Sequence, residues 1–80
     1  MNLWLISQTD VKGWDTFDSA VVAAETEEEA KLMYPGNGDD IRNESGEFWT
    51  KRPELVTAIL IGNATNGIEK GVVCASFHAG

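Results

Sequence analysis

Residue types able to carry out catalysis are sparse in this sequence. The chain holds a single histidine, His78, and a single cysteine, Cys74, four positions apart. In an extended strand this spacing puts both side chains on one face but about 13 Å apart, which is too far for a nucleophile and its general base. We therefore expect Cys74 to be a small buried hydrophobic residue and His78 a polar residue near the chain end. The sequence predicts no catalytic residue, no metal site and no cofactor, so the chain is expected not to be an enzyme.

Acidic residues gather in two stretches that look like loops. Asp15 and Asp18 flank one of them, and Asp39 and Asp40 lie in the other. Carboxylates can bind divalent cations, but the D-x-D-x-D-G spacing of a calcium loop is absent. Aspartate at such positions also accepts hydrogen bonds from the backbone of its own turn. We favour this turn chemistry over metal binding.

The stretch "KGWDTFD" is the best candidate for a binding site. Aromatic faces alternate there with hydrogen-bonding groups, a combination that suits a flat polar ligand or a contact centre for a partner protein. The alternative is that an aromatic ring tucks under the sheet while the polar groups hold the turn. The candidate residues in this stretch are Lys12, Trp14, Asp15, Thr16, Phe17 and Asp18.

A second candidate lies in the long polar connection that covers residues 36–54. Phe48 and Trp49 are large aromatic residues among polar neighbours, and they either fold back over the core, which we favour, or form a contact surface. Lys51 and Arg52 follow after one residue. Together with Trp49 they form the best cationic cluster for a nucleotide, because a phosphate needs cationic or amide donors.

The charge balance restricts the partners. The 80 residues carry a net charge of −7, which disfavours direct binding to nucleic acid, because such binding requires clustered Lys and Arg. A basic partner is compatible, including a protein whose basic groove normally holds nucleic acid. The opening "MNLWLIS" has neither the charged region nor the apolar length of a signal peptide or membrane span. We expect a cytoplasmic protein that does not bind membranes.

The elements that would position these residues follow from apolar patterning and capping signals. Residues 3–7, 19–25, 55–62 and 71–80 have the patterns of strands. Thr26 and Glu29 match a helix capping box, and Pro35-Gly36 ends the predicted helix after about eight residues. Asn66-Gly67 favours a tight hairpin turn between the last two strands. The sequence thus predicts one α+β domain over residues 1–80, in the order β-β-α-β-β, with a four-stranded, mainly antiparallel sheet and one short helix on one face.

Such a helix is too short to cover the sheet, whose strands carry apolar residues on both faces. Exposed apolar area on this scale usually marks an interface. We therefore expect a homo-oligomer, most economically a dimer, that forms through the sheet face or through an edge strand.

Three stretches, "WDTFDSAVVAAETEEEA", "VTAILIGNA" and "GVVCASFHAG", resemble a family of short uncharacterised proteins from phages and phage-derived regions. The resemblance covers most of the chain except residues 36–50 and brings no mechanism with it. It implies a phage setting, in which small acidic proteins often act by binding. The expected function is counter-defence, either by occluding a host defence protein or by sequestering a small nucleotide signal. The alternative is a structural or regulatory accessory of phage assembly that acts through its sheet face.

Overall fold

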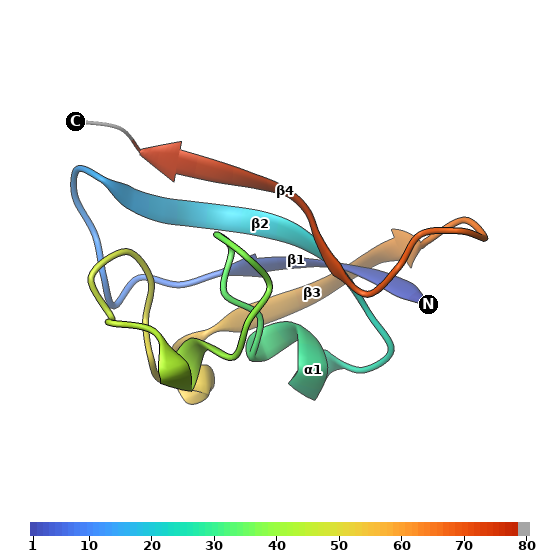
Figure 1. The fold of residues 1–80 in the computed structure, drawn as a ribbon, viewed down its shortest axis with the longest axis horizontal. Helices are drawn as coiled ribbons and strands as arrows, with labels where there is room; N and C mark the ends of the chain where they lie inside the picture. Colours follow the sequence, from blue (N-terminus) through green and yellow to red (C-terminus); the bar gives the residue numbers. More distant parts are fainter. Residues whose placement is uncertain (79–80) are drawn as a thin grey trace.

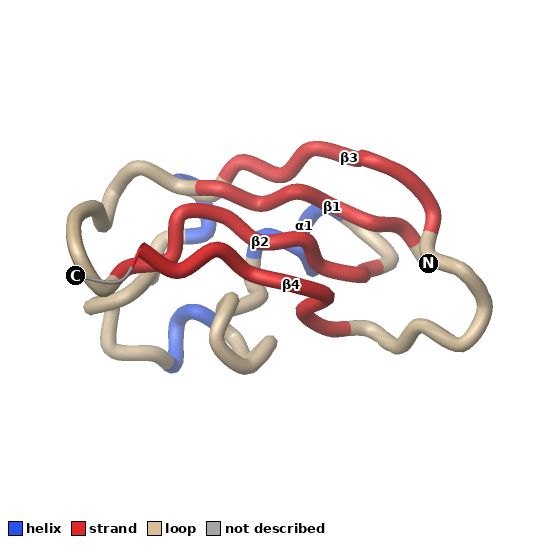
Figure 2. The backbone as a smooth tube through the Cα atoms, turned by 90° about the horizontal axis from the view of Figure 1, so that it is seen from above, coloured by secondary structure: helices blue, strands red, loops and turns tan. Residues whose placement is uncertain are grey.

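A computed structural model describes residues 1–78, and its four strands form one antiparallel sheet in the order β3-β1-β2-β4 (Figures 1 and 2). The strands are β1 Asn2–Ser7, β2 Thr16–Ala24, β3 Thr57–Asn63 and β4 Gly71–His78. The helix α1, Glu27–Lys31, packs against the sheet, and the short 3-10 turns Ile41–Asn43 and Pro53–Leu55 lie between α1 and β3. The predicted α+β class and β-β-α-β-β order are confirmed. Positions 79 and 80 of the predicted fourth strand lie outside the described residues.

The central hairpin β1–β2 organises the core. Directly opposite residues of an antiparallel pair share a face, and the register joins Ile6 to Ala20 and Trp4 to Val22. Ile6 and Val22 are fully buried, together with Ala30 of α1. Alternate residues of both strands therefore form the face that α1 and the connection to β3 cover. Figure 2 shows the four strands side by side with α1 behind them.

The predicted hairpin between the last two strands is wrong. The turn itself forms, since Gly67 has a φ of 98° and the Ile68 amide donates to the carbonyl oxygen of Thr65 at 3.2 Å. However, β3 pairs with β1 and β4 pairs with β2, so the two strands lie at opposite edges. Residues 64–70 cross the width of the sheet, about 14 Å at about 4.8 Å between strands. A local turn signal fixes the backbone of the turn but leaves open which strands pair.

The helix begins where the sequence predicts and ends earlier. The Glu29 amide donates to the Thr26 hydroxyl oxygen at 3.2 Å, as a capping box requires. The reciprocal carboxylate bond reaches the amide of Glu25, at 3.1 Å, one residue before the cap. The helix has only five residues, because Met33 then forms a bridge with Asp40 and the chain leaves the helical path.

The connection after α1 completes the core. Ile41, Trp49 and Val56 are buried under the sheet at 0%, 1% and 3% exposure. The favoured prediction that the aromatic pair folds back over the core is therefore confirmed for Trp49, whereas Phe48 stays 38% exposed. The indole Nε1 of Trp49 is buried without a hydrogen-bond partner among the described residues.

The face of the sheet turned away from α1 is called the open face here, and it consists of three rows across the strands. The first row is Thr57, Ser7, Ser19 and Ser76, the middle row is Ile59, Leu5, Val21 and Cys74, and the last row is Gly62, Leu3, Ala23 and Gly71. Cys74 is exposed, so the prediction of a buried cysteine is wrong. The reason is that its edge strand presents it on the face opposite α1.

Candidate functional site

The loop between β1 and β2, residues 8–15, is held in shape by one buried glutamine. The Gln8 side chain is 8% exposed. Its Oε1 accepts from the Val11 amide at 2.8 Å, while its Nε2 donates to the carbonyl oxygen of Val11 at 2.8 Å and to that of Phe17 at 3.4 Å. The amide group is therefore occupied in tying the loop to β2, and the loop presents a defined surface.

The next turn directs Trp14 outward. Gly13 has a φ of 108° and Asp15 a φ of 62°, both in the left-handed region, which aspartate tolerates better than most residues. The Thr16 hydroxyl donates to the Gly13 carbonyl oxygen at 2.9 Å, and its side chain is buried at 4% exposure. The predicted site residue Thr16 therefore lies beneath the surface, where its hydroxyl closes the turn. Trp14 lies between Gly13 and Asp15 and is 69% exposed.

Aromatic side chains from β2, β4 and the loop meet at this end of the sheet. Trp14 lies edge-on to His78 with ring centroids 4.5 Å apart, and Phe17 lies edge-on to Phe77 at 4.8 Å. Phe77 is 44% exposed, whereas Phe17 is half-buried and packs against the core. The Asp15 amide donates to the carbonyl oxygen of His78, which ties the loop to the end of β4. The backbone that carries Trp14 is thus tied to the end of β4, where the Trp14 ring contacts His78.

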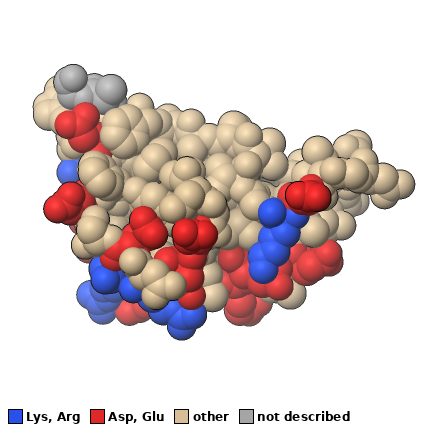
Figure 3. Space-filling model, viewed as in Figure 1, with Lys and Arg blue, Asp and Glu red and all other residues tan. Residues whose placement is uncertain are grey.

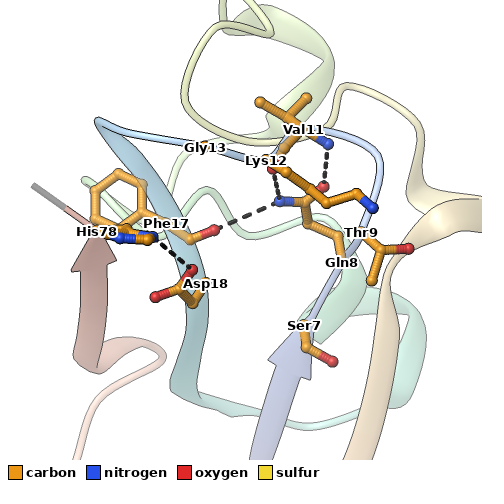
Figure 4. A pocket seen from close by; sticks show the side chains of 9 residues that line it. All are labelled: Ser7, Gln8, Thr9, Val11, Lys12, Gly13, Phe17, Asp18 and His78. Carbon is orange, nitrogen blue, oxygen red and sulfur yellow. Dashed lines mark hydrogen bonds and ion pairs between the residues drawn. The ribbon is translucent and has the colours of Figure 1, made fainter. Parts of the chain in front are cut away.

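A hollow of about 510 Å³ opens beside these rings (Figure 4). Phe17, Asp18 and His78 line it from the two strands, and Lys12 lines it from the loop. Dashed lines in Figure 4 join Gln8 to Val11 and to Phe17, and Asp18 to His78, where Asp18 Oδ1 lies 4.0 Å from His78 Nδ1. Asp18 and Lys12 are exposed, so the hollow offers one carboxylate and one ammonium group at its rim.

We call the exposed surface formed by Trp14, Asp15, Asp18, Phe77 and His78 the acidic-aromatic end. The predicted residues Lys12 and Phe17 border it through the hollow. A flat aromatic surface beside carboxylates can hold a cation that is also planar, because an arginine guanidinium stacks on a ring and pairs with a carboxylate at the same time.

Most of the cations lie elsewhere and are already paired. Lys31 Nζ lies 3.5 Å from Glu27, Arg52 Nε lies 3.1 Å from Glu54, and Lys70 Nζ lies 3.7 Å from Glu29. Arg42 binds Asp40 at 2.6 Å, and its hydrogen bonds lower the pKa of that carboxyl to about 2. Among residues 1–78, this leaves Lys12 and Lys51 without an ion pair, and only Lys12 lies near the acidic-aromatic end.

The predicted cluster of Trp49, Lys51 and Arg52 is divided between the core and the surface. The ring of Trp49 is buried in the core, so it cannot stack on a ligand at the surface. Lys51 and Arg52 are exposed, but Arg52 pairs with Glu54 and neither residue lines the hollow beside β2. The expectation of a nucleotide site at this cluster is wrong for Trp49, because a hydrophobic ring of that size is more stable under the sheet than at its edge.

Gln8, Phe77 and His78 belong to this end of the molecule and are missing from the sequence-based candidates. Phe77 and His78 end β4, and the register places them opposite Phe17 and Thr16. The pairing of the last strand with β2 would have revealed them, but the strand order could not be read from the sequence. Gln8 gave no signal, because its role is to hold the loop.

Within residues 1–78 no group of His, Cys, Asp or Glu side chains is arranged to hold a metal ion. No helix in the same part of the chain has the length and apolar character needed to cross a membrane. No protein-family model, curated protein or solved structure matches the chain. The resemblance to short phage proteins therefore stays a prediction.

Proposed function

We propose that this chain is a non-enzymatic binding protein that covers a basic surface of a partner protein with its acidic-aromatic end. The observation that carries the proposal is the 69% exposure of Trp14, whose ring lies edge-on to His78 at 4.5 Å, while Asp18 Oδ1 lies 4.0 Å from Nδ1 of the same histidine. Tryptophan is among the residues most enriched in the contact centres of protein interfaces. The backbone beside Trp14 is tied to β4 through the Asp15 amide, so part of the loop ordering that binding requires is already present.

The charge of the chain supports a basic partner. The net charge is −7, and four of the cations are in ion pairs with carboxylates of the same chain. An approaching basic surface would therefore be attracted over long range, and its association rate would fall as salt screens the charges. At contact, an arginine over Trp14 would gain about 0.5–1 kcal/mol from the ring. A pair with Asp18 would add about 0.2–1 kcal/mol.

A nucleotide signal is the less favoured ligand. Its phosphates would need several cations or amide donors, and Lys12 is the single cation lining the hollow of residues 7–18 and 78. Asp18 lines the same hollow and would repel a phosphate. A nucleotide is therefore the alternative ligand in the titrations described below.

The resemblance to short phage proteins supplies the setting of the proposal. An acidic protein that covers a basic groove could deny a host defence enzyme its nucleic acid, which is counter-defence by occlusion. The second candidate, an accessory protein of phage assembly, would use the sheet face. The uncharged open face is the observation that favours it.

The test is calorimetric titration of the chain with an arginine-rich peptide, with the citrulline form of the same peptide as the neutral control. We expect heat with the arginine form alone, and weaker binding at higher salt. Trp14→Ala should lower the affinity about tenfold or more. Asp18→Asn should lower it by about 2- to 5-fold. Glu28→Gln is the matched control, because it removes one exposed carboxylate from α1, which follows the opposite end of β2 from Asp18. It should leave the affinity nearly unchanged.

Three results would contradict the proposal. Equal effects of Asp18→Asn and Glu28→Gln would mean that net charge alone drives the binding. An unchanged affinity of Trp14→Ala would mean that the indole ring does not contact the peptide. Heat with a mononucleotide or dinucleotide, but none with the arginine peptide, would favour sequestration of a nucleotide signal in the hollow.

A further inference from the structure

The open face has a regular composition across its rows. The middle row is aliphatic on three strands and ends in a cysteine, namely Ile59, Leu5, Val21 and Cys74. The row beside it toward the β1–β2 loop consists of hydroxyl residues, and the row on the other side consists of Gly, Ala and Leu. A sheet surface with small side chains and one aliphatic row is suited to packing against another sheet, at a separation of about 10 Å.

No residue of the three rows carries a charge, although the chain as a whole has a net charge of −7. In Figure 3 the charged side chains gather in the lower part of the molecule and at its ends, and its upper part is almost entirely uncharged. Two copies of this acidic chain repel each other over most of their surfaces. The open face is where they can approach with the least repulsion, whereas a basic partner would find no carboxylate there to bind.

We infer that the open face is an interface with a second copy of this chain, in which the middle rows of the two copies pack on each other. A two-fold axis through the middle row brings that row onto itself, whether the axis runs along the strands or across them. The interface is therefore self-complementary, as a closed dimer requires. Asp18 directly precedes Ser19 of the first row, and Ser7 of that row lines the hollow beside Asp18, so the hydroxyl row borders the acidic-aromatic end.

The size of the open face sets the strength of the association. Four strands at about 4.8 Å spacing and six residues at about 3.3 Å give a surface of roughly 400 Å² per copy. Stable interfaces bury about 800 Å² per partner, so this dimer belongs with the small, transient interfaces. We therefore expect a dissociation constant in the micromolar range or weaker.

The edges of the sheet are less suited to pairing with another copy. The register with β1 shifts between Leu3 and Trp4, which leaves Ile61 as an extra residue in β3, and the register between β2 and β4 shifts at Val73. Bulges of this kind twist an edge strand away from straight pairing. Experiment can distinguish pairing through the open face from pairing along the β3 edge. Neighbouring residues of β3 lie on the same edge but point to opposite faces of the sheet.

Sedimentation of the chain across micromolar and millimolar concentrations tests the inference, with Ile59→Lys and Leu60→Lys as a matched pair of variants. Both residues lie on the same edge strand and are similarly exposed, at 52% and 56%. Ile59 pairs with Leu5 on the open face, whereas Leu60 pairs with Trp4 on the opposite face. We expect the wild type to pass from monomer to dimer, Ile59→Lys to weaken the dimer about tenfold or more, and Leu60→Lys to leave it nearly unchanged.

The thiol of Cys74 gives a second readout, because it is exposed in the monomer and lies in the middle row. Its rate of reaction with a thiol reagent should fall as the wild-type concentration rises, and should stay constant for Ile59→Lys. A monomer at every concentration would overturn the inference. Equal losses in both variants would indicate pairing along the β3 edge instead, and growth beyond a dimer would indicate open-ended assembly. Both of these results also overturn it.

Discussion

Replacement of Trp49 by alanine should strongly destabilise the protein, whereas the same change at Trp14 should scarcely affect its stability. Trp49 is 1% exposed and packs with Ile6 and Val22, while Trp14 is 69% exposed. A buried tryptophan replaced by alanine costs about 3–5 kcal/mol. A domain of this length has a free energy of unfolding of only about 4–12 kcal/mol, at about 0.05–0.15 kcal/mol per residue.

One feature of Trp49 lowers the expected cost toward the bottom of that range. Its indole N–H is buried without a partner among the described residues, and such a group destabilises the native state by about 1–3 kcal/mol. Trp49→Ala and Trp49→Phe both remove this donor, so we expect Trp49→Ala to lower the free energy of unfolding by about 3 kcal/mol. Trp49→Phe keeps most of the ring and should cost clearly less, about 1–2 kcal/mol.

The assay is urea denaturation followed by far-UV circular dichroism, because the fluorescence of each variant differs by a tryptophan. With a slope of about 1 kcal/mol per M for a small domain, Trp49→Ala should lower the midpoint by about 3 M. Trp14→Ala should lower it by less than about 1 M, since its described ring contact is the edge-on one with His78. Similar midpoints for the two alanine variants would refute the assignment of one ring to the core and the other to the surface.

Two further predictions concern the caps. Thr26→Ala removes the hydroxyl that accepts from the Glu29 amide and should cost about 1 kcal/mol, measured as a lower urea midpoint; an unchanged midpoint would mean that α1 needs no cap. The pKa of Asp40 is lowered from 3.8 to about 2, chiefly by the side-chain hydrogen bond from Arg42, so its contribution to stability is present above about pH 4 and is lost as the pH falls toward 2. A carboxyl titration by NMR should show this low pKa, and Asp40→Asn should remove that part of the acid dependence; an ordinary aspartate titration would contradict the contact.

Several elements could be predicted because their signals are local. Apolar alternation in "LWLIS" identifies β1, since the period of two is a property of the strand itself. Thr26 and Glu29 identify the start of α1, because the cap is made within four residues. The exposure of Lys12 in a polar loop also follows from such local patterning, whereas Asp18, which the same pattern assigns to the loop, is exposed within β2.

Other features depend on which strands become neighbours, and no local signal carries that information. Gly67 adopts its turn conformation, yet β3 and β4 are at opposite edges, because pairing is decided by how the whole sheet buries its apolar residues. The exposure of Cys74 and the meeting of His78 with Trp14 follow from the place of β4 beside β2. For Thr16, the register could not distinguish a ligand contact from a hydroxyl that closes its own turn.

The most direct test of the proposed binding function is an NMR titration of the labelled chain with the arginine-rich peptide, read residue by residue. We expect the largest chemical shift changes at the Trp14 indole and at the amides of Asp18 and His78, and small changes along the middle row of the open face. Shifts confined to α1 and the open face, with the Trp14 indole unchanged, would contradict it.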